Sequence, residues 1–301
     1  MSEDPVARAL GAAISQAIGA KFDVTSLAPV GGGCIHTALE VRGKSRGGAP
    51  RYFAKVNEAS SAAMFAAEAD GLAALAAARS VAVPAVVARG HDDERAWLVL
   101  QWLDLAPLAD ASAAALGHAL AAQHRIAHER FGWGSDNFIG ASPQANGWSD
   151  DWLAFWREKR LHAQLRIAAG KRLPSRMIDR GERLAADCGA LIGNRRVAGS
   201  LLHGDLWGGN AAALEGGAAA LFDPAVYVGD READVAMTEL FGGFPADFLA
   251  AYRADWNLDD GYTVRRDLYN LYHVLNHANL FAGAYVRQAE RSIAKLLAEI
   301  A

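Results

Sequence analysis

The sequence of 301 residues is poor in cysteine, in excess positive charge and in long apolar runs. Its two cysteines, Cys34 and Cys188, are too few for a disulfide framework, so nothing in the chain requires an oxidising compartment. The 30 Lys and Arg residues are outnumbered by 34 Asp and Glu residues, and the net charge of −4 gives no support to a nucleic-acid partner.

No apolar run reaches the roughly 20 residues that a membrane-spanning helix needs. The first residues are acidic and are soon followed by Arg8, which is unlike a signal peptide. No segment stands out as an interaction surface. We therefore expect a cytoplasmic protein that has no membrane partner and is a monomer.

What is present indicates a soluble globular chain, with 52% hydrophobic and 21% charged residues. In residues 1–103, strand-like patterns alternate with glycine-rich turns and one internal helix, residues 60–78, which Ser60 is placed to cap. A helix capped by Asp4, with Pro5 in its first turn, precedes them as a packing helix. The strands are expected at residues 24–30, 35–41, 52–57, 85–90 and 96–103.

From residue 104 onward the pattern is mainly helical, except for two short strands expected within residues 201–223. The fold class expected is therefore α+β, with a small N-lobe built on an antiparallel sheet (1–103) and a larger helical C-lobe (104–301). The helices are expected at residues 110–129, 149–169, 175–193, 231–241, 245–255, 263–283 and from about 286.

The stretch LLHGDLWGGN, residues 201–210, brings Asp205 and Asn210 together, and Asp223 follows the next strand. Phosphoryl transfer needs a carboxylate to orient the attacking hydroxyl and oxygen ligands for Mg²⁺, and D-x-x-x-x-N followed by a later aspartate is the spacing that kinases use. This pattern predicts Asp205 as the base and Asn210 and Asp223 as the magnesium ligands. The alternative is that these are loop residues that bond only to local backbone.

Two residues upstream favour the phosphoryl-transfer interpretation. Lys55 lies in the strand YFAKVN, on the face opposite Ala54 and Val56. Glu68 lies on an otherwise apolar stripe of the following helix, where a carboxylate is costly unless it is paired. We expect Lys55 to be its partner and to hold the nucleotide phosphates; the alternative for Lys55 is an exposed strand lysine.

The remaining nucleotide contacts are expected from backbone groups. Gly32 and Gly33, in the cluster GGGC, are placed to cover the phosphates with their N–H groups. The extended segment LVLQWL is expected to act as the hinge that binds adenine, so Gln101, Trp102 and Leu103 are assigned to the nucleotide. Cys34 is either a redox-sensitive thiol in this phosphate loop or a small residue that fits the turn.

Four stretches together resemble the fructosamine kinase, or ketosamine-3-kinase, family, which is related to the aminoglycoside phosphotransferases. They are HGDLWGGN, GGGCIHTALEV (31–41), FGWGSDNFIGASPQANGWSDDWLAFW (131–156) and FDPAVYVGDREADVAMTELFGGF (222–244). The resemblance covers both lobes. It implies a protein-kinase-like fold and ATP-dependent phosphorylation of a ketosamine, free or on a glycated protein, at the hydroxyl of the third sugar carbon. The product is unstable and releases the amine, which is a deglycation repair.

By motif position, the resemblance implies the roles already given for Asp205, Lys55, Glu68, Asn210 and Asp223. The chain departs from the family at His36, where relatives often have Asn, and at Gly209, where many carry Ser. Gln101 also stands where an acidic hinge residue is common.

Three residues near the motif have two interpretations each. Trp207 either presents a flat face to the sugar or its linked amine, or packs the lobe. His203 is expected to bond loop backbone rather than to act as an acid or base. Asp234, in the run GDREAD, is expected to anchor the catalytic loop rather than to touch substrate.

Two other functions stay open from the sequence. One is a phosphotransferase for a different amine-bearing acceptor, such as an aminoglycoside or choline. The other is a nucleotide-binding pseudokinase without chemistry. A protein-serine kinase is disfavoured because no A-P-E motif follows Asp223, and because the chain leaves little room there for a peptide-docking loop.

Overall fold

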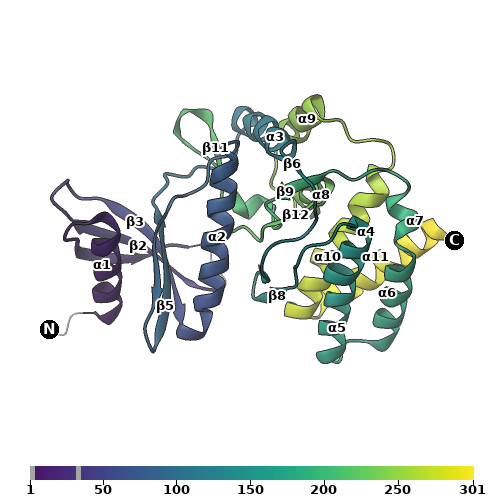
Figure 1. Ribbon diagram of the computed structural model, residues 1–301, viewed down its shortest axis with the longest axis horizontal. Coiled ribbons are helices and arrows are strands. Elements are labelled where there is room, and N and C mark those ends of the chain that lie inside the picture. Colours follow the sequence, from purple (N-terminus) through teal and green to yellow (C-terminus); the bar gives the residue numbers. More distant parts are fainter. Residues whose placement is uncertain (1–3, 32–34) are drawn as a thin grey trace.

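The structure is a computed structural model that describes residues 4–31 and 35–301. It has two lobes side by side (Figure 1). The N-lobe contains a five-stranded antiparallel sheet in the order β1-β2-β3-β5-β4. Its strands are β1 (Asp23–Pro29), β2 (Thr37–Lys44), β3 (Arg51–Glu58), β4 (Val86–His91) and β5 (Arg95–Gln101). The predicted small antiparallel sheet is confirmed.

Two helices cover opposite faces of this sheet (Figure 1). Helix α1 (Pro5–Ile18) is capped by the Asp4 carboxylate, which accepts the amide N–H of Val6 at 2.9 Å, and its Leu10 side chain is fully buried. The predicted packing helix is thus confirmed. Helix α2 (Ala62–Ala78) begins after the 3₁₀ turn Ala59–Ser61 and has no side-chain cap, so the predicted Ser60 cap is wrong.

Helix α2 also corrects the expectation that no segment is apolar enough to span a bilayer. By length and composition alone, Ala59–Ala78 passes that test, because its many alanines raise the mean hydropathy although few of its residues are large. In this fold its Phe65, Leu72 and Leu75 side chains are buried. Phe65 and Leu72 pack on the sheet with Leu98 of β5. The helix therefore belongs to the core of the N-lobe.

The C-lobe is mainly helical, as predicted. The segment expected as one helix at 149–169 is instead interrupted by a π-helical turn, Arg157–Leu161. The helices are α3 (Asp110–His124), α4 (Trp152–Trp156), α5 (His162–Gly170), α6 (Ser175–Asp187), α7 (Gly189–Ile192), α8 (Glu232–Leu240), α9 (Ala246–Asp255), α10 (Tyr262–Phe281) and α11 (Ala284–Ile300).

Short strands position the loops of the C-lobe. The chain forms a three-stranded sheet in the order β12-β9-β6 and two hairpins, β7-β8 and β10-β11. Their bounds are β6 (Ala127–His128), β7 (Asn137–Ile139), β8 (Ser142–Gln144), β9 (Gly199–Leu202), β10 (Ala211–Ala213), β11 (Ala219–Leu221) and β12 (Tyr227–Asp230). Strands within 201–223 were expected; β6, β7, β8 and β12 were not. The HGDLWGGN motif connects β9 to β10.

The two lobes meet where α2 packs on the chain after β11. A Cβ atom at Gly71 would lie 3.3 Å from Pro224 and Val226, and Leu75 packs in a cluster with Leu201 and Val226. This contact brings the N-lobe helix beside the aspartate at 223. The connection between β5 and α3 contains the lobe boundary predicted near residue 103, which stays a prediction.

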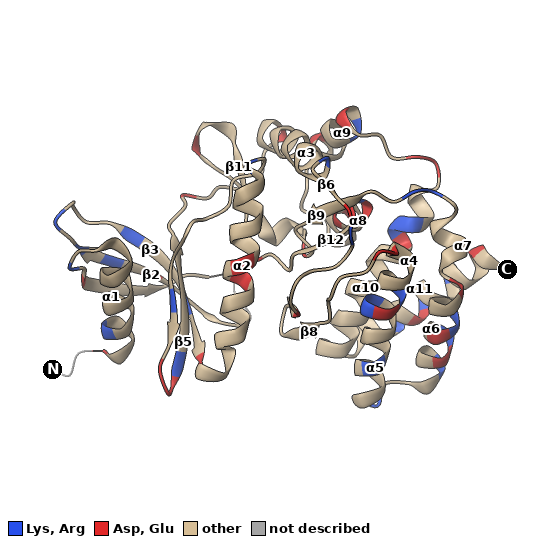
Figure 2. Ribbon diagram, viewed as in Figure 1, with Lys and Arg blue, Asp and Glu red and all other residues tan. Residues whose placement is uncertain are grey.

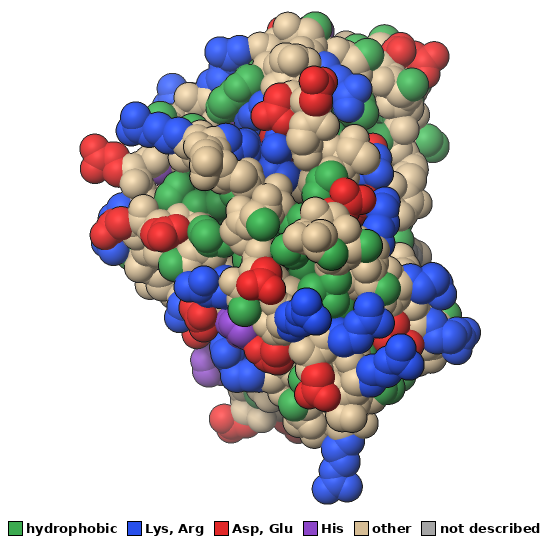
Figure 3. Space-filling model, turned by 90° about the vertical axis from the view of Figure 1, so that its right-hand side faces the viewer, with side chains coloured by type: hydrophobic (Ala, Val, Ile, Leu, Met, Phe, Trp, Pro, Cys, Tyr) green, Lys and Arg blue, Asp and Glu red, His purple; other side chains and the backbone are tan. Residues whose placement is uncertain are grey.

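Charged side chains of both signs are interspersed over the two lobes (Figure 2). Basic side chains gather at the far end of the C-lobe (Figure 3). There, a groove between α6 and α11 is lined by Arg176, Arg180, Arg287 and Arg291, together with Glu290. This small basic area lies on helices that carry none of the predicted site residues.

Close packing of α3 on α9 depends on Gly117. A Cβ atom there would lie 2.3 Å from the carbonyl oxygen of Phe248 and 3.0 Å from the Cβ of Ala251. Gly117→Ala is expected to lower the free energy of unfolding by about 1–3 kcal/mol, because the helices must move apart. Urea unfolding measures this. As a control, Gly170→Ala at the end of α5 meets no atom within 4 Å; equal losses in both variants would contradict the packing argument.

Candidate active site

The catalytic-loop candidate begins with a tight turn after β9. Gly204 has a φ of +81°, and a Cβ atom there would lie 2.0 Å from the carbonyl oxygen of Ala225. The amide N–H of Ala225 also donates to the carbonyl of His203 at 2.8 Å. Glycine is therefore required at 204, because any side chain would separate this loop from the segment after Asp223.

Asp234 holds the loop by its backbone. Its carboxylate accepts the amide N–H groups of His203 at 2.7 Å and Gly204 at 2.8 Å, and contacts His124 Nε2 at 3.3 Å. Burial alone would raise the pKa of Asp234, but the hydrogen bonds that it accepts from His124 and from the Gly204 amide hold it below its usual value. The prediction that Asp234 anchors the loop backbone is confirmed.

His203 is also structural, as predicted. Its Nδ1 accepts the amide N–H of Asp205 at 3.3 Å, and its Nε2 donates to the carbonyl of Phe222 at 3.0 Å. Burial lowers the pKa of His203, so the neutral ring keeps one donor and one acceptor nitrogen. The ring therefore links the catalytic loop to the end of β11.

Asp234→Asn is expected to lower turnover about tenfold or more and to destabilise the fold by about 1–3 kcal/mol. The reason is that an Asn side chain has a single acceptor oxygen, whereas both carboxylate oxygens of Asp234 accept a backbone N–H. The carboxylate contributes stability above its unfolded pKa and loses it as the pH falls through the lower, folded value. The deficit of the variant should therefore shrink in acid. Denaturant unfolding at pH 3 and 7 tests this, because the loss begins only below the unfolded pKa of about 4; a deficit independent of pH would contradict it.

Asp205, Asn210 and Asp223 are brought together as predicted. Asn210 Nδ2 donates to the carbonyl oxygen of Asp205 at 2.9 Å and lies 3.4 Å from both Asp205 Oδ2 and the carbonyl oxygen of Asp223. Burial and the charge of Asp223 raise the pKa of Asp205 to about 7. Asp205 is therefore poised to take up a proton near neutral pH.

Lys55 lies between two carboxylates. Its Nζ is 2.7 Å from Glu68 Oε1 and 2.6 Å from Asp223 Oδ1. The alternative of an exposed strand lysine is wrong, because the Lys55 side chain is only 8% exposed. Burial would lower the pKa of Lys55, but the two carboxylates outweigh it and raise the pKa above its ordinary value. The predicted pair of Lys55 with Glu68 is confirmed. The second contact of Lys55 joins the N-lobe to Asp223.

A polar cluster missed by the sequence interpretation supports the segment after this aspartate. Asn137 Nδ2 donates to the carbonyl of Val226 at 2.7 Å, and Gln144 Nε2 donates to the carbonyl of Ala225 at 3.0 Å. Tyr272 in turn donates to Gln144 Oε1 at 2.7 Å. These side chains come from the β7-β8 hairpin and α10, so neither motif spacing nor periodicity signals them.

The hinge differs in one respect from the expectation. The amide N–H of Gln101 donates to the carbonyl of Ala85 at 2.8 Å, within the β4-β5 edge. That N–H is therefore occupied, and any adenine contact from this strand falls to the Gln101 carbonyl or to Trp102 and Leu103. The nucleotide roles of these three residues stay predictions.

The phosphate loop is only partly described. Gly32, Gly33 and Cys34 lie outside the described residues, so their predicted roles are not examined by the structure. Next to them, His36 Nδ1 is 2.8 Å from Asn57 Nδ2. Burial and the charge of Lys55 lower the pKa of His36 to about 4, so its imidazole is neutral.

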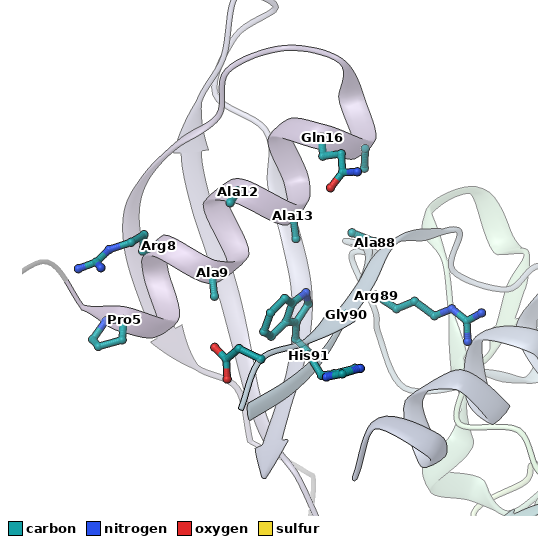
Figure 4. A pocket seen from close by; sticks show the side chains of 13 residues that line it. Pro5, Arg8, Ala9, Ala12, Ala13, Gln16, Ala88, Arg89, Gly90 and His91 are labelled. Carbon is teal, nitrogen blue, oxygen red and sulfur yellow. The ribbon is translucent and has the colours of Figure 1, made fainter. Parts of the chain in front are cut away.

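A surface pocket on the N-lobe is separate from this site. It lies between α1 and β4 and is lined by alanines such as Ala9 and Ala13 and by Gly90 and His91 (Figure 4). Helix α1 covers the face of the sheet opposite the one that Lys55 shares with α2. The pocket is therefore not part of the candidate site.

The residues present fit a magnesium ion bound mainly by phosphate oxygens. Among residues 4–31 and 35–301, no group of three or more His, Cys, Asp or Glu side chains is placed to hold a metal. Burial, together with repulsion from the neighbouring Asp223 carboxylate, nevertheless raises the pKa of Asp205. A cation beside Asp223 and Asn210 would relieve that repulsion, and oxygen ligands suit Mg²⁺.

The fold and site define a class of protein. A two-lobed chain with a strand lysine paired to a helix glutamate, a D-x-x-x-x-N loop and a later aspartate is a protein-kinase-like phosphotransferase in architecture. At a finer level, a model of the fructosamine kinase family matches residues 6–299. The chain belongs to the fructosamine kinase family.

Individual relatives agree with this assignment. A probable ketoamine kinase of Synechocystis sp. is 41% identical over 285 residues, covering 94% of this chain and 94% of that protein. The chloroplastic protein-ribulosamine 3-kinase of Arabidopsis thaliana is 36% identical over 288 residues, covering 95% of this chain and 85% of that protein.

Solved structures show the same fold. A candidate fructosamine-3-kinase from Haemophilus somnus 129PT superposes with a TM-score of 0.86 at 28% identity, covering 96% of each chain. The gentamicin complex of the phosphotransferase APH(2'')-IIa has a TM-score of 0.61 at 14% identity, covering 100% of this chain and 96% of that one, and shows a shared fold alone. The predicted fold class is confirmed.

Proposed function

We propose that this chain is an ATP-dependent kinase that phosphorylates a sugar hydroxyl of ketosamines, the fructosamine or ribulosamine adducts of amines. The observation that carries the proposal is the contact of Lys55 with Glu68 at 2.7 Å and with Asp223 at 2.6 Å, beside the loop from Asp205 to Asn210. The names of the relatives, ketoamine kinase and protein-ribulosamine 3-kinase, support the acceptor class. The activity would begin a deglycation, because the phosphorylated adduct releases its amine.

The mechanism proposed is direct in-line transfer. The Asp205 carboxylate accepts a hydrogen bond from the sugar hydroxyl and orients its oxygen toward the γ-phosphorus of ATP. As the new P–O bond forms, the bond to the ADP oxygen breaks and the hydroxyl proton passes to Asp205. Lys55 exchanges its contact with Asp223 for the nucleotide phosphates and remains held by Glu68.

Mg²⁺ is part of this proposal. The Asp223 carboxylate and the Asn210 amide oxygen would hold it, and when bound it neutralises charge on the phosphates. The Asp223 side chain is 46% exposed, so its carboxylate is accessible to a nucleotide-bound ion.

The cellular location, oligomeric state and partners that we propose are those expected from the sequence. We infer a cytoplasmic monomer that acts on free or protein-bound ketosamines and has neither a nucleic-acid nor a membrane partner. Size-exclusion chromatography tests the monomer, and a dimer would overturn it.

An ADP-release assay tests the function. Purified protein is given ATP and Mg²⁺ with ribulosyl-lysine, fructosyl-lysine, an aminoglycoside, choline or no acceptor, and Asp205→Asn is the control. Ketosamine-dependent ADP release that is lost in the variant supports the proposal. Release only with the aminoglycoside or choline, or ATP binding without release under any condition, would replace it with one of the two alternatives.

A further inference from the structure

Arg160 is a fully buried cation in the π-helical turn between α4 and α5. Within the part of the chain that the structure describes, none of the ion pairs includes it. Its guanidinium lies instead against the rings of Tyr227, at 4.0 Å, and Phe155, at 4.7 Å. A buried charge is costly unless a partner compensates it, and π-helical turns occur frequently at functional sites. Both facts favour a functional role over a packing role.

Arg160 binds the chain directly after β8. Its Nη1 donates to the carbonyl of Ala145 at 2.6 Å, and its Nη2 donates to Asn146 Oδ1 at 2.9 Å. A guanidinium can only donate hydrogen bonds. Asn146 therefore has to present its amide oxygen to the arginine, which leaves its amide nitrogen for the opposite side.

This direction is passed on to Asn137. Asn146 Nδ2 donates to Asn137 Oδ1 at 2.9 Å, so Asn137 presents its own nitrogen to the carbonyl of Val226, at 2.7 Å. Gln144 Nε2 reinforces the arrangement, because it donates to Asn137 Oδ1 at 2.8 Å and to the carbonyl of Ala225 at 3.0 Å. The three amide side chains are at most 5% exposed, so water does not compete for these bonds. We call them the amide relay.

The amide relay ends on the backbone that follows Asp223. This aspartate has a φ of +57°, in the left-handed region that residues with a side chain rarely adopt. In this conformation its Oδ1 lies 2.6 Å from Lys55 Nζ. The next residue, Pro224, has no N–H group with which to hold the chain. The bonds of the relay to the carbonyls of Ala225 and Val226 therefore help to fix the backbone on this side of the aspartate.

We propose that Arg160 is a positioning residue for the metal-binding aspartate. The relay that it directs keeps Asp223 in the strained conformation that its carboxylate needs in order to meet Lys55 and the nucleotide-bound Mg²⁺. The inference rests on the proposed function and adds to it a buried residue that acts through the backbone. Partners behind a metal ligand fix its orientation, and their loss typically lowers metal affinity about ten- to a hundredfold.

Asn146→Asp separates positioning from packing. The carboxylate still accepts a hydrogen bond from Arg160, and it gives the buried cation a counter-charge. It cannot donate to Asn137 Oδ1, however, so the relay is broken at its first step. If Arg160 only packs the lobe, this variant is harmless to metal binding; if Arg160 positions the aspartate, the variant weakens it.

Calorimetric titration of the protein with ADP, at a series of Mg²⁺ concentrations and with a chelator, measures the effect. For Asn146→Asp and Arg160→Met, we expect the Mg²⁺ concentration that half-maximally strengthens ADP binding to rise about ten- to a hundredfold, while the ADP affinity in chelator is unchanged. The matched control is Arg157→Met, in the same π-helical turn. That side chain is 35% exposed and pairs with Glu158, so neither value should change.

The outcomes separate this inference from the proposed function. If Mg²⁺ strengthens ADP binding equally in the wild type and both variants, the metal site stands and the positioning role is wrong. An equal loss of ADP affinity with and without Mg²⁺ would show that Arg160 supports only the fold, which also overturns the role. If Arg160→Met does not fold, Asn146→Asp decides alone. If Mg²⁺ does not strengthen ADP binding by the wild type, the metal part of the proposed function fails and the inference fails with it.

Discussion

Asp205→Asn is expected to lower turnover by about a hundredfold to ten-thousandfold and, at the same time, to raise the stability of the fold. The loss of turnover follows from the removal of the carboxylate that orients the hydroxyl and takes its proton, a role typically worth a factor of about 10²–10⁴. The gain in stability follows from the site itself, where burial and the charge of Asp223 raise the pKa of Asp205 to about 7.

The sign of the stability effect depends on pH. An aspartate is half protonated near pH 4 when unfolded, and in the fold Asp205 is half protonated near pH 7. Between these values the folded state binds more protons, so the free energy of unfolding falls as the pH rises. Asparagine is neutral at every pH, so the free energy of unfolding of the variant does not fall for this reason. The advantage of the variant should therefore grow from pH 4 to 7 and stay constant at higher pH.

Thermal unfolding at pH 5 and 8, without nucleotide and with a metal chelator, measures this difference, since a bound cation would lower the pKa of Asp205. We expect a midpoint several degrees above that of the wild type at pH 8 and a smaller difference at pH 5. Asp150→Asn is the control, because that side chain is 84% exposed and outside the loop. Near-full turnover, or a variant less stable than the wild type at pH 8, would exclude the assigned role and environment.

The lysine-glutamate pair shows what the sequence predicts well. Strand alternation places Lys55 on the face opposite Ala54, and a single carboxylate on the apolar stripe of the next helix requires a nearby cation. Both statements rest on local periodicity, and the pair is present at 2.7 Å. Motif spacing likewise predicts the contact of Asn210 with Asp205, because only a short loop separates them.

The residues that the sequence did not reveal depend on tertiary contacts. Arg160 is fully buried in the π-helical turn; its guanidinium lies 4.0 Å from the centroid of the Tyr227 ring and donates to the carbonyl of Ala145 at 2.6 Å. From periodicity alone it is an ordinary exposed arginine of a helix at 149–169. The Asn137 and Gln144 contacts have the same origin, since polar residues in a hairpin give no sign of what they face.

The cap at Ser60 failed for a related reason. Serine before an apolar helical run is a sound local signal, but the chain enters α2 through a 3₁₀ turn whose Ala59 N–H donates to the carbonyl of Glu94. A contact with the β4-β5 turn therefore decides how the helix begins. Local propensity and tertiary packing disagree here, and packing determines the structure.

Lys55→Met is expected to lower kcat/KM for ATP by about a hundredfold or more and to destabilise the fold by about 3 kcal/mol at pH 8. The first effect follows from the loss of the cation on the nucleotide phosphates. The second follows because Glu68, whose side chain is 12% exposed, loses its counter-charge, and removing one partner of a buried ion pair costs more than removing both. Asp223 is 46% exposed and contributes less, since water screens it.

The double variant Lys55→Met/Glu68→Leu separates these two effects. Replacing both charges with apolar side chains removes the uncompensated carboxylate, so we expect it to recover most of the stability lost in Lys55→Met and none of the activity. The wild-type lysine stays charged across pH 5–9, since its pKa is raised, so the deficit of the single variant should shrink only where Glu68 takes up a proton in acid. Urea unfolding of the single and double variants at pH 5 and 8, with the ADP-release assay alongside, measures both effects. A double variant less stable than Lys55→Met would show that Glu68 is held by contacts other than the lysine, and recovered activity would show that Lys55 does not hold the nucleotide.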